Sequence, residues 1–566
     1  MIVLHLPLRG GLIAALIALT VNSAATAQDS AFGGFVRQPL DGPAHNCITP
    51  REHDHVRDLL AAYEAAHGPL SAPEPSSSSL LYPFWPQAGY VYGDLFSGLF
   101  VDQDPSSGFR DYSCRDFTYN THAGIDCGLR SFAEQMIGVP VFAVLEGTVV
   151  ATQDGFDDMN VSGKNNDANF VIIDHGKGRL GYYWHLKKNS VIVTPGQPVV
   201  AGQQIGLTAS SGYSFGPHLH FESRDLPDYT VFDPFAGDCR PGDSGWADQE
   251  PLNLDTYFVD FAFTYEDLFQ HDPLPYEQPR TGQIATSDGF IYFWMIFANL
   301  PPGSTWRNVF IRPDGTTAYD SGDVEFGWNY FIRQSGLFFY WWIPDMHTIT
   351  GRWRVQVYFN GALMTDAPIE VVVERDPQFN RPPEPISLRF DPPAPTDADA
   401  IFCRLDTDLV LDDLDYDVVR YEYTWRIDGN EVRRVTSAGH ADAIPRGLAP
   451  AGSVVECLVT PSDGRTTGTS ATISAVVGDA GSNCSGEEKL KARCREKRGA
   501  YLLKAKISGG APGATLTFRL DERPETDNAQ NVNNRGKAVA KFNGLTAGEH
   551  AVEVLECGLR KNVTCE

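Results

Sequence analysis

Two short segments of this chain, about a hundred residues apart, carry side chains of the kinds that bind metal ions. Residues 216–222 read GPHLHFE and place His218 and His220 two positions apart. In an extended strand such residues project from one face about 7 Å apart, so both imidazoles enter one small volume. The earlier segment, THAGID, contains His122 and Asp126. A fold that uses all four side chains must bring the two segments side by side.

Together the segments provide the ligands of a catalytic zinc site. Two imidazoles and one carboxylate leave a fourth position for water, the usual arrangement when zinc takes part in hydrolysis. In a straight strand His122 and Asp126 would lie about 13 Å apart. The chain must therefore bend between them, and Gly124 permits a bend. With 14 histidines in the chain, either segment alone is more often a surface or core feature than a metal site.

The sequence between the two segments favours a small β domain. Short apolar and β-branched runs alternate with glycines, which is typical of antiparallel strands joined by tight turns. These runs lie at residues 138–150, 169–176, 183–186 and 196–206.

Residues from about 119 to 224 resemble the lysostaphin/LytM-type zinc metallopeptidases, which are bacterial peptidoglycan endopeptidases. The resemblance covers about a fifth of the chain, and its motifs, including the YWHL element at 183–186, follow in the family's order. It implies that one zinc per chain is held by His122, Asp126 and His220. It also implies that His185 and His218 are catalytic histidines that do not bind the metal. The chain departs from the family at the long polar loop 154–168 and at the cysteine-bearing approach to His122, which puts the shape of the groove in question.

The proposed roles follow from the chemistry of neutral histidine. An imidazole beside the open position can take a proton from the attacking water and pass it to the leaving amine, and we assign this role to His218. His185 then donates a hydrogen bond to the developing oxyanion, although the two roles can be exchanged. Glu222 either orients a ligand or faces water. His175 follows an apolar run, and we interpret it as structural.

The first 27 residues have the pattern of a secretory signal. Arg9 precedes an apolar run from Leu12 to Val21, and Ala25-Thr26-Ala27 predicts cleavage before Gln28. No later run is long enough to span a membrane. The net charge of −27 argues against nucleic acid and anionic membranes as partners. The expected location is periplasmic or extracellular, and the oligomeric state is left open.

Ten cysteines, an even number, suit an oxidising compartment. Two groups of four can be distinguished, one of Cys47, Cys114, Cys127 and Cys239 and one of Cys484, Cys494, Cys557 and Cys565. Each group allows three connectivities. The preferred pairs are Cys114–Cys127, Cys47–Cys239, Cys403–Cys457, Cys484–Cys565 and Cys494–Cys557.

The predicted fold is mainly β and multidomain. An antiparallel β metallopeptidase domain at 81–250 follows an N-terminal segment, 28–80, with one helix from Pro50 towards Gly68. A β-sandwich is expected at 252–375, with its aromatic cluster in the core rather than on a glycan-binding surface. The Cys…Trp…Cys pattern indicates an immunoglobulin-like module at 386–478. A small disulfide-stapled β module at 481–566 completes the chain. The Pro-rich segment 381–385 predicts mechanical independence of the parts beyond it.

These observations predict a secreted zinc-dependent endopeptidase that hydrolyses stem or cross-bridge peptides of peptidoglycan. Two alternatives stay open at this point. The same site can cleave glycine-rich exported proteins, or a vacant site can leave a non-catalytic protein that binds the cell wall or activates a hydrolase. The roles of the three later modules, and whether residues 28–80 inhibit the enzyme, are not fixed by the sequence.

Overall fold

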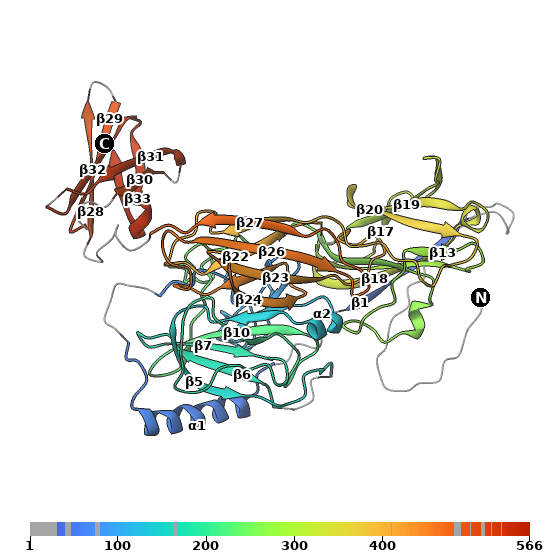
Figure 1. Cartoon of the computed structure of the whole chain (residues 1–566), viewed down its shortest axis with the longest axis horizontal. Coiled ribbons are helices and arrows are strands. Elements are labelled where there is room, and N and C mark those ends of the chain that lie inside the picture. Colours follow the sequence, from blue (N-terminus) through green and yellow to red (C-terminus); the bar gives the residue numbers. More distant parts are fainter. Residues whose placement is uncertain are drawn as a thin grey trace.

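The computed structural model describes residues 31–39, 47–73, 80–162, 167–408, 410–479, 488–497, 500–510, 515–521, 523–533 and 535–565. In these ranges the chain is mainly β, and most neighbouring strands are antiparallel (Figure 1). The predicted fold class is therefore confirmed. The predicted signal sequence lies outside the described residues. Within the described ranges, none of the helices has both the length and the apolar character that crossing a bilayer requires.

The metal-ligand candidates lie on an eight-stranded sheet with the order β2-β3-β10-β7-β6-β5-β8, in which β11 pairs with β10. Its strands are β2 (Phe96–Leu99), β3 (Gly124–Gly128), β5 (Gly147–Gln153), β6 (Phe170–Asp174), β7 (Arg179–Trp184), β8 (Pro198–Val199), β10 (His218–Asp225) and β11 (Thr230–Val231). A separate pair, β4 (Pro140–Phe142) and β9 (Gln204–Leu207), and the short helix α2 (Phe132–Ile137) adjoin this sheet. In the β3–β10 ladder Asp126 lies directly opposite His220. The pairing thus unites the two segments that the sequence singled out.

Helix α1 (Pro50–His67) begins and ends where the sequence predicts. Thr49 caps it, and the Glu52 side chain accepts a hydrogen bond from the Thr49 backbone N–H at 2.8 Å, so both halves of a capping box are present. Gly68, with a φ of 95°, ends the helix.

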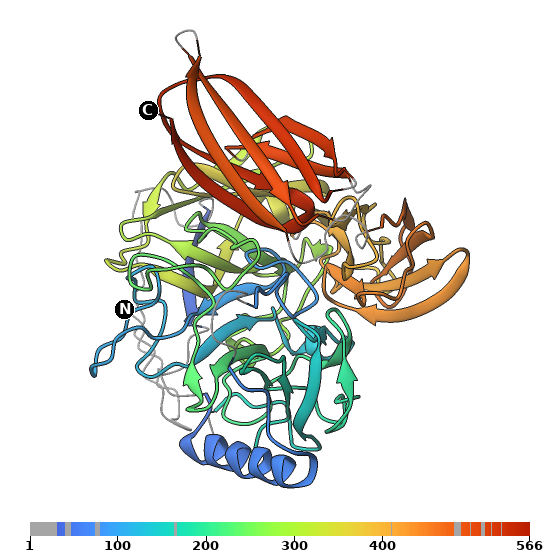
Figure 2. The same ribbon diagram turned by 90° about the vertical axis from the view of Figure 1, so that its left-hand side faces the viewer.

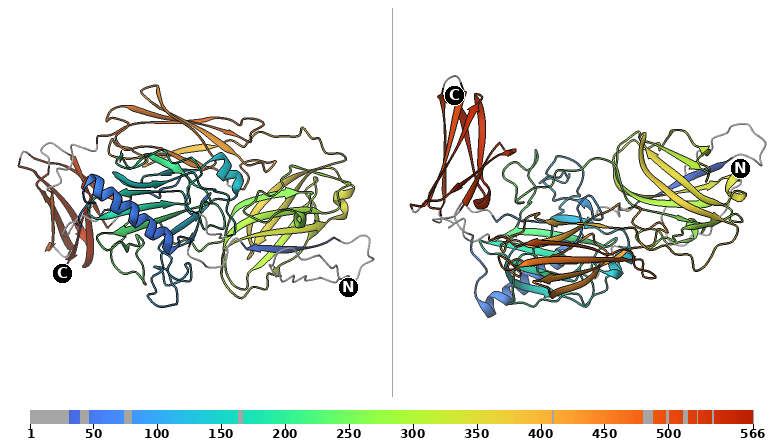
Figure 3. Two further views of the ribbon diagram at one scale, coloured as in Figure 1. Left: turned by 90° about the horizontal axis from the view of Figure 1, so that it is seen from below. Right: turned by 45° about the horizontal axis from the view of Figure 1, so that its top comes forward.

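The buried face of α1 packs on the sheet. Val56 and Leu60 are buried in one cluster with Phe170 and Trp184. Burial of each aliphatic side chain contributes about 1.5–3 kcal/mol. Figure 1 and the left view of Figure 3 show α1 running along the sheet. The helix is therefore anchored to the domain that carries the candidate ligands.

Downstream, two sheets form the expected sandwich. One has the order β1-β18-β14-β12, and the other β13-β20-β19-β15-β16 with β17 beside β15. The strands are β1 (Phe32–Pro39), β12 (Tyr257–Thr264), β13 (Gln283–Ala285), β14 (Ile291–Leu300), β15 (Thr305–Ile311), β16 (Thr317–Asp320), β17 (Val324–Glu325), β18 (Ile332–Trp342), β19 (Gly351–Phe359) and β20 (Ala362–Val372). Asn360 and Gly361 both have positive φ, which confirms the predicted hairpin turn between β19 and β20. Phe339 and Trp341 are buried in the core, as expected of the aromatic cluster.

The first described strand, β1, belongs to this downstream sandwich and not to the N-terminal segment alone. It pairs antiparallel with β18, with Phe32 opposite Trp342. Its glycines allow the close approach, because a Cβ on Gly33 would lie 2.2 Å from the Tyr340 carbonyl oxygen. The segment 28–80 was predicted with one helix, and β1 adds a strand that this prediction missed.

Two further sheets form the next module. Their orders are β21-β22-β25 and β24-β23-β26-β27. The strands are β21 (Ser387–Asp391), β22 (Ile401–Asp406), β23 (Arg420–Ile427), β24 (Asn430–Ser437), β25 (Ala441–Ile444), β26 (Val454–Ser462) and β27 (Ala471–Val476). Cys403, Trp425 and Cys457 share one buried core. The immunoglobulin-like assignment stays a prediction.

This module packs directly on the domain that carries the candidate ligands. The Phe402 ring lies 5.8 Å, centroid to centroid, from Phe142 in an edge-to-face contact. The His440 backbone N–H donates to the Asp94 carboxylate at 2.7 Å. The predicted mechanical independence beyond residue 385 is therefore wrong for this module.

The last module has sheets with the orders β28-β29-β32 and β31-β30-β33-β34. The strands are β28 (Lys489–Lys497), β29 (Ala500–Ser508), β30 (Thr515–Leu520), β31 (Arg523–Asn531), β32 (Lys537–Leu545), β33 (Gly548–Val554) and β34 (Leu559–Cys565). It lies at the opposite side of the molecule from α1 (Figure 2) and stands apart from the other sheets in Figure 1.

The disulfides differ from the preferred pairing. The structure has Cys114–Cys239 and Cys494–Cys565, and Cys557 is also disulfide-bonded. Cys484 lies outside the described residues. Four buried cysteines are free, namely Cys47, Cys127, Cys403 and Cys457. The preferred pairs Cys114–Cys127, Cys47–Cys239, Cys484–Cys565 and Cys494–Cys557 are therefore wrong, because Cys114 bonds to Cys239 and Cys494 bonds to Cys565. Cys403 and Cys457, expected to be bonded, are thiols in contact with each other.

Candidate metal centre

Three predicted ligands converge beside the central pair of the β3–β10 ladder, Asp126 and His220. His220 Nδ1 lies 2.7 Å from Asp126 Oδ1 and 3.3 Å from His122 Nε2. His122 Nε2 lies 3.2 Å from Asp126 Oδ2. All three side chains are buried. Their facing atoms form the kind of donor set that binds a metal.

A hydrogen bond fixes which nitrogen of His122 faces this set. His122 Nδ1 lies 2.6 Å from the Phe100 carbonyl oxygen, which can only accept. Nδ1 therefore carries the proton, and the lone pair of Nε2 faces Asp126. Such an outer hydrogen bond orients a histidine for metal binding.

The bend between His122 and Asp126 has a different cause from the one expected. Thr121 has a φ of 66°, and the His122 backbone N–H donates to the Tyr119 carbonyl at 3.0 Å, so the turn precedes β3. Gly124 lies in the strand. Its role is to leave space, because a Cβ there would lie 2.4 Å from His220 Nε2.

We expect Gly124→Ala to displace the His220 ring and to weaken zinc binding by about 10- to 100-fold, the usual effect of disturbing a ligand's supporting shell. Competition with a chromogenic chelator measures this change. Gly289→Ala is the matched control, since a Cβ at Gly289 meets no atom within 4 Å. If the Gly124→Ala variant and the wild type bound zinc with equal affinity, the argument that a Cβ at residue 124 displaces His220 would be wrong.

The two histidines predicted as non-ligands lie beside the donor set. The ring centroids of His185 and His218 are 4.5 Å apart, and His218 Nε2 lies 3.8 Å from Asp126 Oδ1. His185 Nδ1 lies 2.6 Å from the Ser211 carbonyl oxygen, and His218 Nδ1 lies 2.9 Å from that of Gly216. Both Nδ1 atoms therefore carry protons.

Each of these histidines presents an unprotonated Nε2 to the site. Both Nε2 atoms are buried without a hydrogen-bond partner. A neutral His185 therefore offers a lone pair and no N–H, so it can donate to an oxyanion only after it takes up a proton. This finding limits the role that the sequence assigned to His185.

Burial and charge set the protonation states. Burial lowers the pKa of His185 well below its usual value and also lowers the pKa of His218, which keeps both rings neutral. Burial by itself would raise the pKa of Asp126, but the facing His122, His218 and His220 hold it well below its usual value. Metal binding needs an ionised carboxylate, and this shift supplies it. Burial by itself would lower the pKa of His122, but the facing Asp126 raises it, so a metal competes with a proton at this ring.

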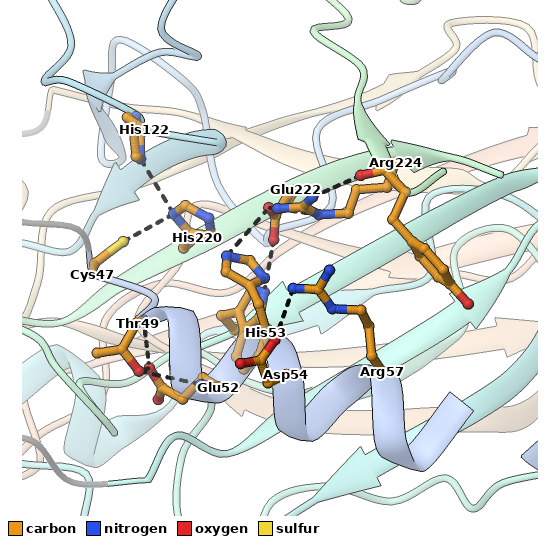
Figure 4. A network of polar contacts seen from close by, with 12 residues as sticks. Cys47, Thr49, Glu52, His53, Asp54, Arg57, His122, His220, Glu222 and Arg224 are labelled. Carbon is orange, nitrogen blue, oxygen red and sulfur yellow. Dashed lines mark hydrogen bonds and ion pairs between the residues drawn. The ribbon is translucent and has the colours of Figure 1, made fainter. Parts of the chain in front are cut away.

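One residue of the site was not predicted there. Cys47 Sγ lies 3.2 Å from His220 Nδ1 and 3.2 Å from the Tyr119 hydroxyl oxygen (Figure 4). Its sulfur and the donor atoms of His122, Asp126 and His220 all lie within 4.8 Å of one another. The sequence placed Cys47 in a disulfide, and no local motif marked it as a possible ligand.

Two cavities flank the site. One of about 420 Å³ is lined by His122 and His220 together with Ile48, and the other, of about 400 Å³, by Asp126 and His218 together with Cys47. Tyr119 lines both cavities. The Cys47-Ile48 segment and Tyr119 therefore stand between two hollows that meet the ligands from different sides.

Three neighbouring groups have structural roles. Glu222 is fully buried, accepts from Trp184 Nε1 at 3.3 Å and pairs with Arg224, so the prediction that it faces water is wrong. His175 Nδ1 donates to the Glu146 carbonyl at 3.0 Å, and burial lowers its pKa to about 4. This arrangement fits the structural role expected of His175. The third group is His53, whose Nε2 lies 4.0 Å from Glu222 Oε1.

Residues 120–234 match the model of Peptidase family M23. Over 86 residues the chain is 38% identical to the peptidoglycan DD-endopeptidase ShyA of Vibrio cholerae. The aligned segment covers 15% of this chain and 17% of that protein. Over 113 residues it is 34% identical to lysostaphin of Staphylococcus simulans, covering 20% of this chain and 21% of that one. The catalytic domain of lysostaphin from Staphylococcus simulans is 24% identical, with 25% of this chain and 88% of that domain covered and a TM-score of 0.17.

The clustered histidines and carboxylate thus lie within a segment that matches a peptidase family. Specifically, the chain contains a Peptidase family M23 domain at residues 120–234. The chain spans about a fifth of the length of these curated relatives.

The donor set fits zinc, the metal of this family. Two imidazole nitrogens and a carboxylate are zinc ligands, and Asp126 is held ionised, as binding needs. His122, Asp126 and His220 would hold the ion.

Proposed function

We propose that this protein is an exported zinc-dependent endopeptidase that hydrolyses peptide bonds in the stem or cross-bridge peptides of peptidoglycan. The observation that carries the proposal is the convergence of His122, Asp126 and His220, with His185 and His218 beside them, in an M23 domain. The relatives named above include a peptidoglycan DD-endopeptidase, which supports the substrate class. Zinc, when bound, polarises the scissile carbonyl and acidifies water.

The chain's own residues accept the proton and return it. His218 Nε2 has a free lone pair, and its side chain is 16% exposed, so it can accept a proton from the attacking water and return it to the leaving amine. The Gly216 carbonyl holds the His218 Nδ1 proton and keeps Nε2 aimed at the site. His185 is fully buried and neutral, so its Nε2 lone pair can accept a hydrogen bond from the attacking water and orient it.

The net charge of −27 gives no long-range attraction to an anionic wall. We therefore propose that the substrate is recognised by shape and hydrogen bonding in the two cavities beside the ligands.

Digestion of purified peptidoglycans with different cross-bridge chemistry tests the proposal. We expect new amino termini, identified by mass spectrometry, within stem or cross-bridge peptides, and none after zinc is chelated. The digestion is run with the full chain and with Cys47→Ala, because the thiol lies inside the site. Absence of new termini from both proteins would overturn the proposal, and cleavage of glycine-rich proteins alone would redirect it.

A further inference from the structure

We propose that Cys47 is a fourth protein ligand of the metal and that it keeps the enzyme latent. The inference rests on the proposed function, since it concerns the same zinc site. An open hydrolytic site needs one exchangeable position. A thiolate in that position gives the four-ligand arrangement of zinc sites that are closed to substrate.

The position of the sulfur supports this assignment. Cys47 Sγ approaches Nδ1 of His220, the same nitrogen that faces Asp126. Figure 4 shows Cys47 and His122 directed at His220 from different sides. Thiolate is a ligand that zinc favours, and Cys47 is free to act as one because its predicted partner, Cys239, is bonded to Cys114.

The sulfur also occupies the volume that the reaction needs. It lies within 4.8 Å of ring nitrogens of His185 and His218, and within the same distance of the three ligands. It therefore stands between the residues that hold the metal and those that move the proton. The Nε2 atoms of His185 and His218 are buried without a partner and face this space. While the thiol holds the fourth position, neither water nor a scissile carbonyl can bind there.

The chain holds Cys47 in place from both sides. On the C-terminal side Thr49 caps α1, whose Val56 packs in the same buried cluster as Cys47 and Ile48. On the N-terminal side β1 is paired with β18 of the downstream sandwich. The Cys47 backbone N–H donates to the Tyr119 hydroxyl at 3.0 Å, and that hydroxyl donates to the sulfur. A tethered ligand has a high effective concentration, so an external molecule displaces it poorly.

Under this proposal residues 47–67 are an inhibitory segment, and Cys47 is its reactive group. Release of this segment by proteolysis, or modification of the thiol, would vacate the fourth position. The two cavities on either side of Cys47-Ile48 would then join along the ligands.

The full chain loaded with cobalt(II) in place of zinc tests ligation without relying on activity. We expect a near-ultraviolet thiolate-to-cobalt absorption band in the wild type. In Cys47→Ala this band should be lost, while one cobalt per chain and the circular dichroism spectrum are retained. Cys403→Ala, which removes a buried free thiol from another module, is the matched control and should keep the band. Absence of the band in the wild type, or its persistence in Cys47→Ala, would overturn the assignment.

Cleavage of a soluble cross-bridge peptide by the zinc-loaded proteins tests latency. If the open form is at most about a tenth of the population, Cys47→Ala raises the rate about tenfold or more. An active wild type that Cys47→Ala does not exceed would overturn latency. If neither protein cleaves any peptide although the cobalt band behaves as expected, the ligand assignment stands and the proposed function fails.

Discussion

Replacing His220 with alanine is expected to remove most of the bound zinc from a protein that otherwise carries about one ion per chain. His220 is the central donor, because its Nδ1 faces Asp126, His122 and Cys47 at 2.7, 3.3 and 3.2 Å. Without it, the set loses the one nitrogen that lies within 3.3 Å of each of the other three donors. Elemental analysis of protein purified without chelator gives the stoichiometry.

The control for this substitution is His55→Ala, which removes an exposed imidazole on α1. It should retain the full zinc content. Because His220 is buried, circular dichroism must show that the variant folds before its metal content is interpreted. A folded His220→Ala protein that retains all its zinc would contradict the assignment of His220 as a ligand.

His185→Ala and His218→Ala are each expected to keep zinc and to lose activity by about two to four orders of magnitude. Losses of this size follow removal of a proton-transfer or charge-stabilising group. Neither ring belongs to the donor set centred on His220, so metal content should not change. The readouts are kcat on a soluble peptide and zinc per chain.

Both variants are measured in parallel on the Cys47→Ala background, so that latency does not hide the loss. His67→Ala, an exposed histidine at the end of α1, serves as the control and should match its parent. Near-normal turnover in either variant would remove that histidine from the mechanism. Loss of zinc along with activity would move it to the ligand set.

Features encoded within a few residues could be predicted from the sequence. The strand period placed His218 and His220 on one face, and the cap residues Thr49 and Glu52 marked the start of α1. The antiparallel strands between the two ligand segments also follow local glycine and β-branched patterns. These signals do not depend on where distant parts of the chain lie.

Features that depend on distant segments could not be predicted in the same way. β1 pairs with a strand about 300 residues away, and no pattern within residues 32–39 identifies that partner. The role of Gly124 became visible only when His220 was placed against it. Cys47 was assigned by counting cysteines, but its neighbours come from separate parts of the chain, Tyr119 and His220 among them.

The pairing of β1 with β18 also sets an order of assembly. The ladder closes a loop of about 300 residues, and such non-local contacts form late because loop closure must come first. During synthesis the M23 domain is complete long before residues 332–342 exist. The earliest described strand is thus among the last that can pair, and a chain interrupted before β18 would expose β1 as an unpaired edge. The place of β1 in the sheet therefore depends on a part of the chain that is synthesised after the whole M23 domain.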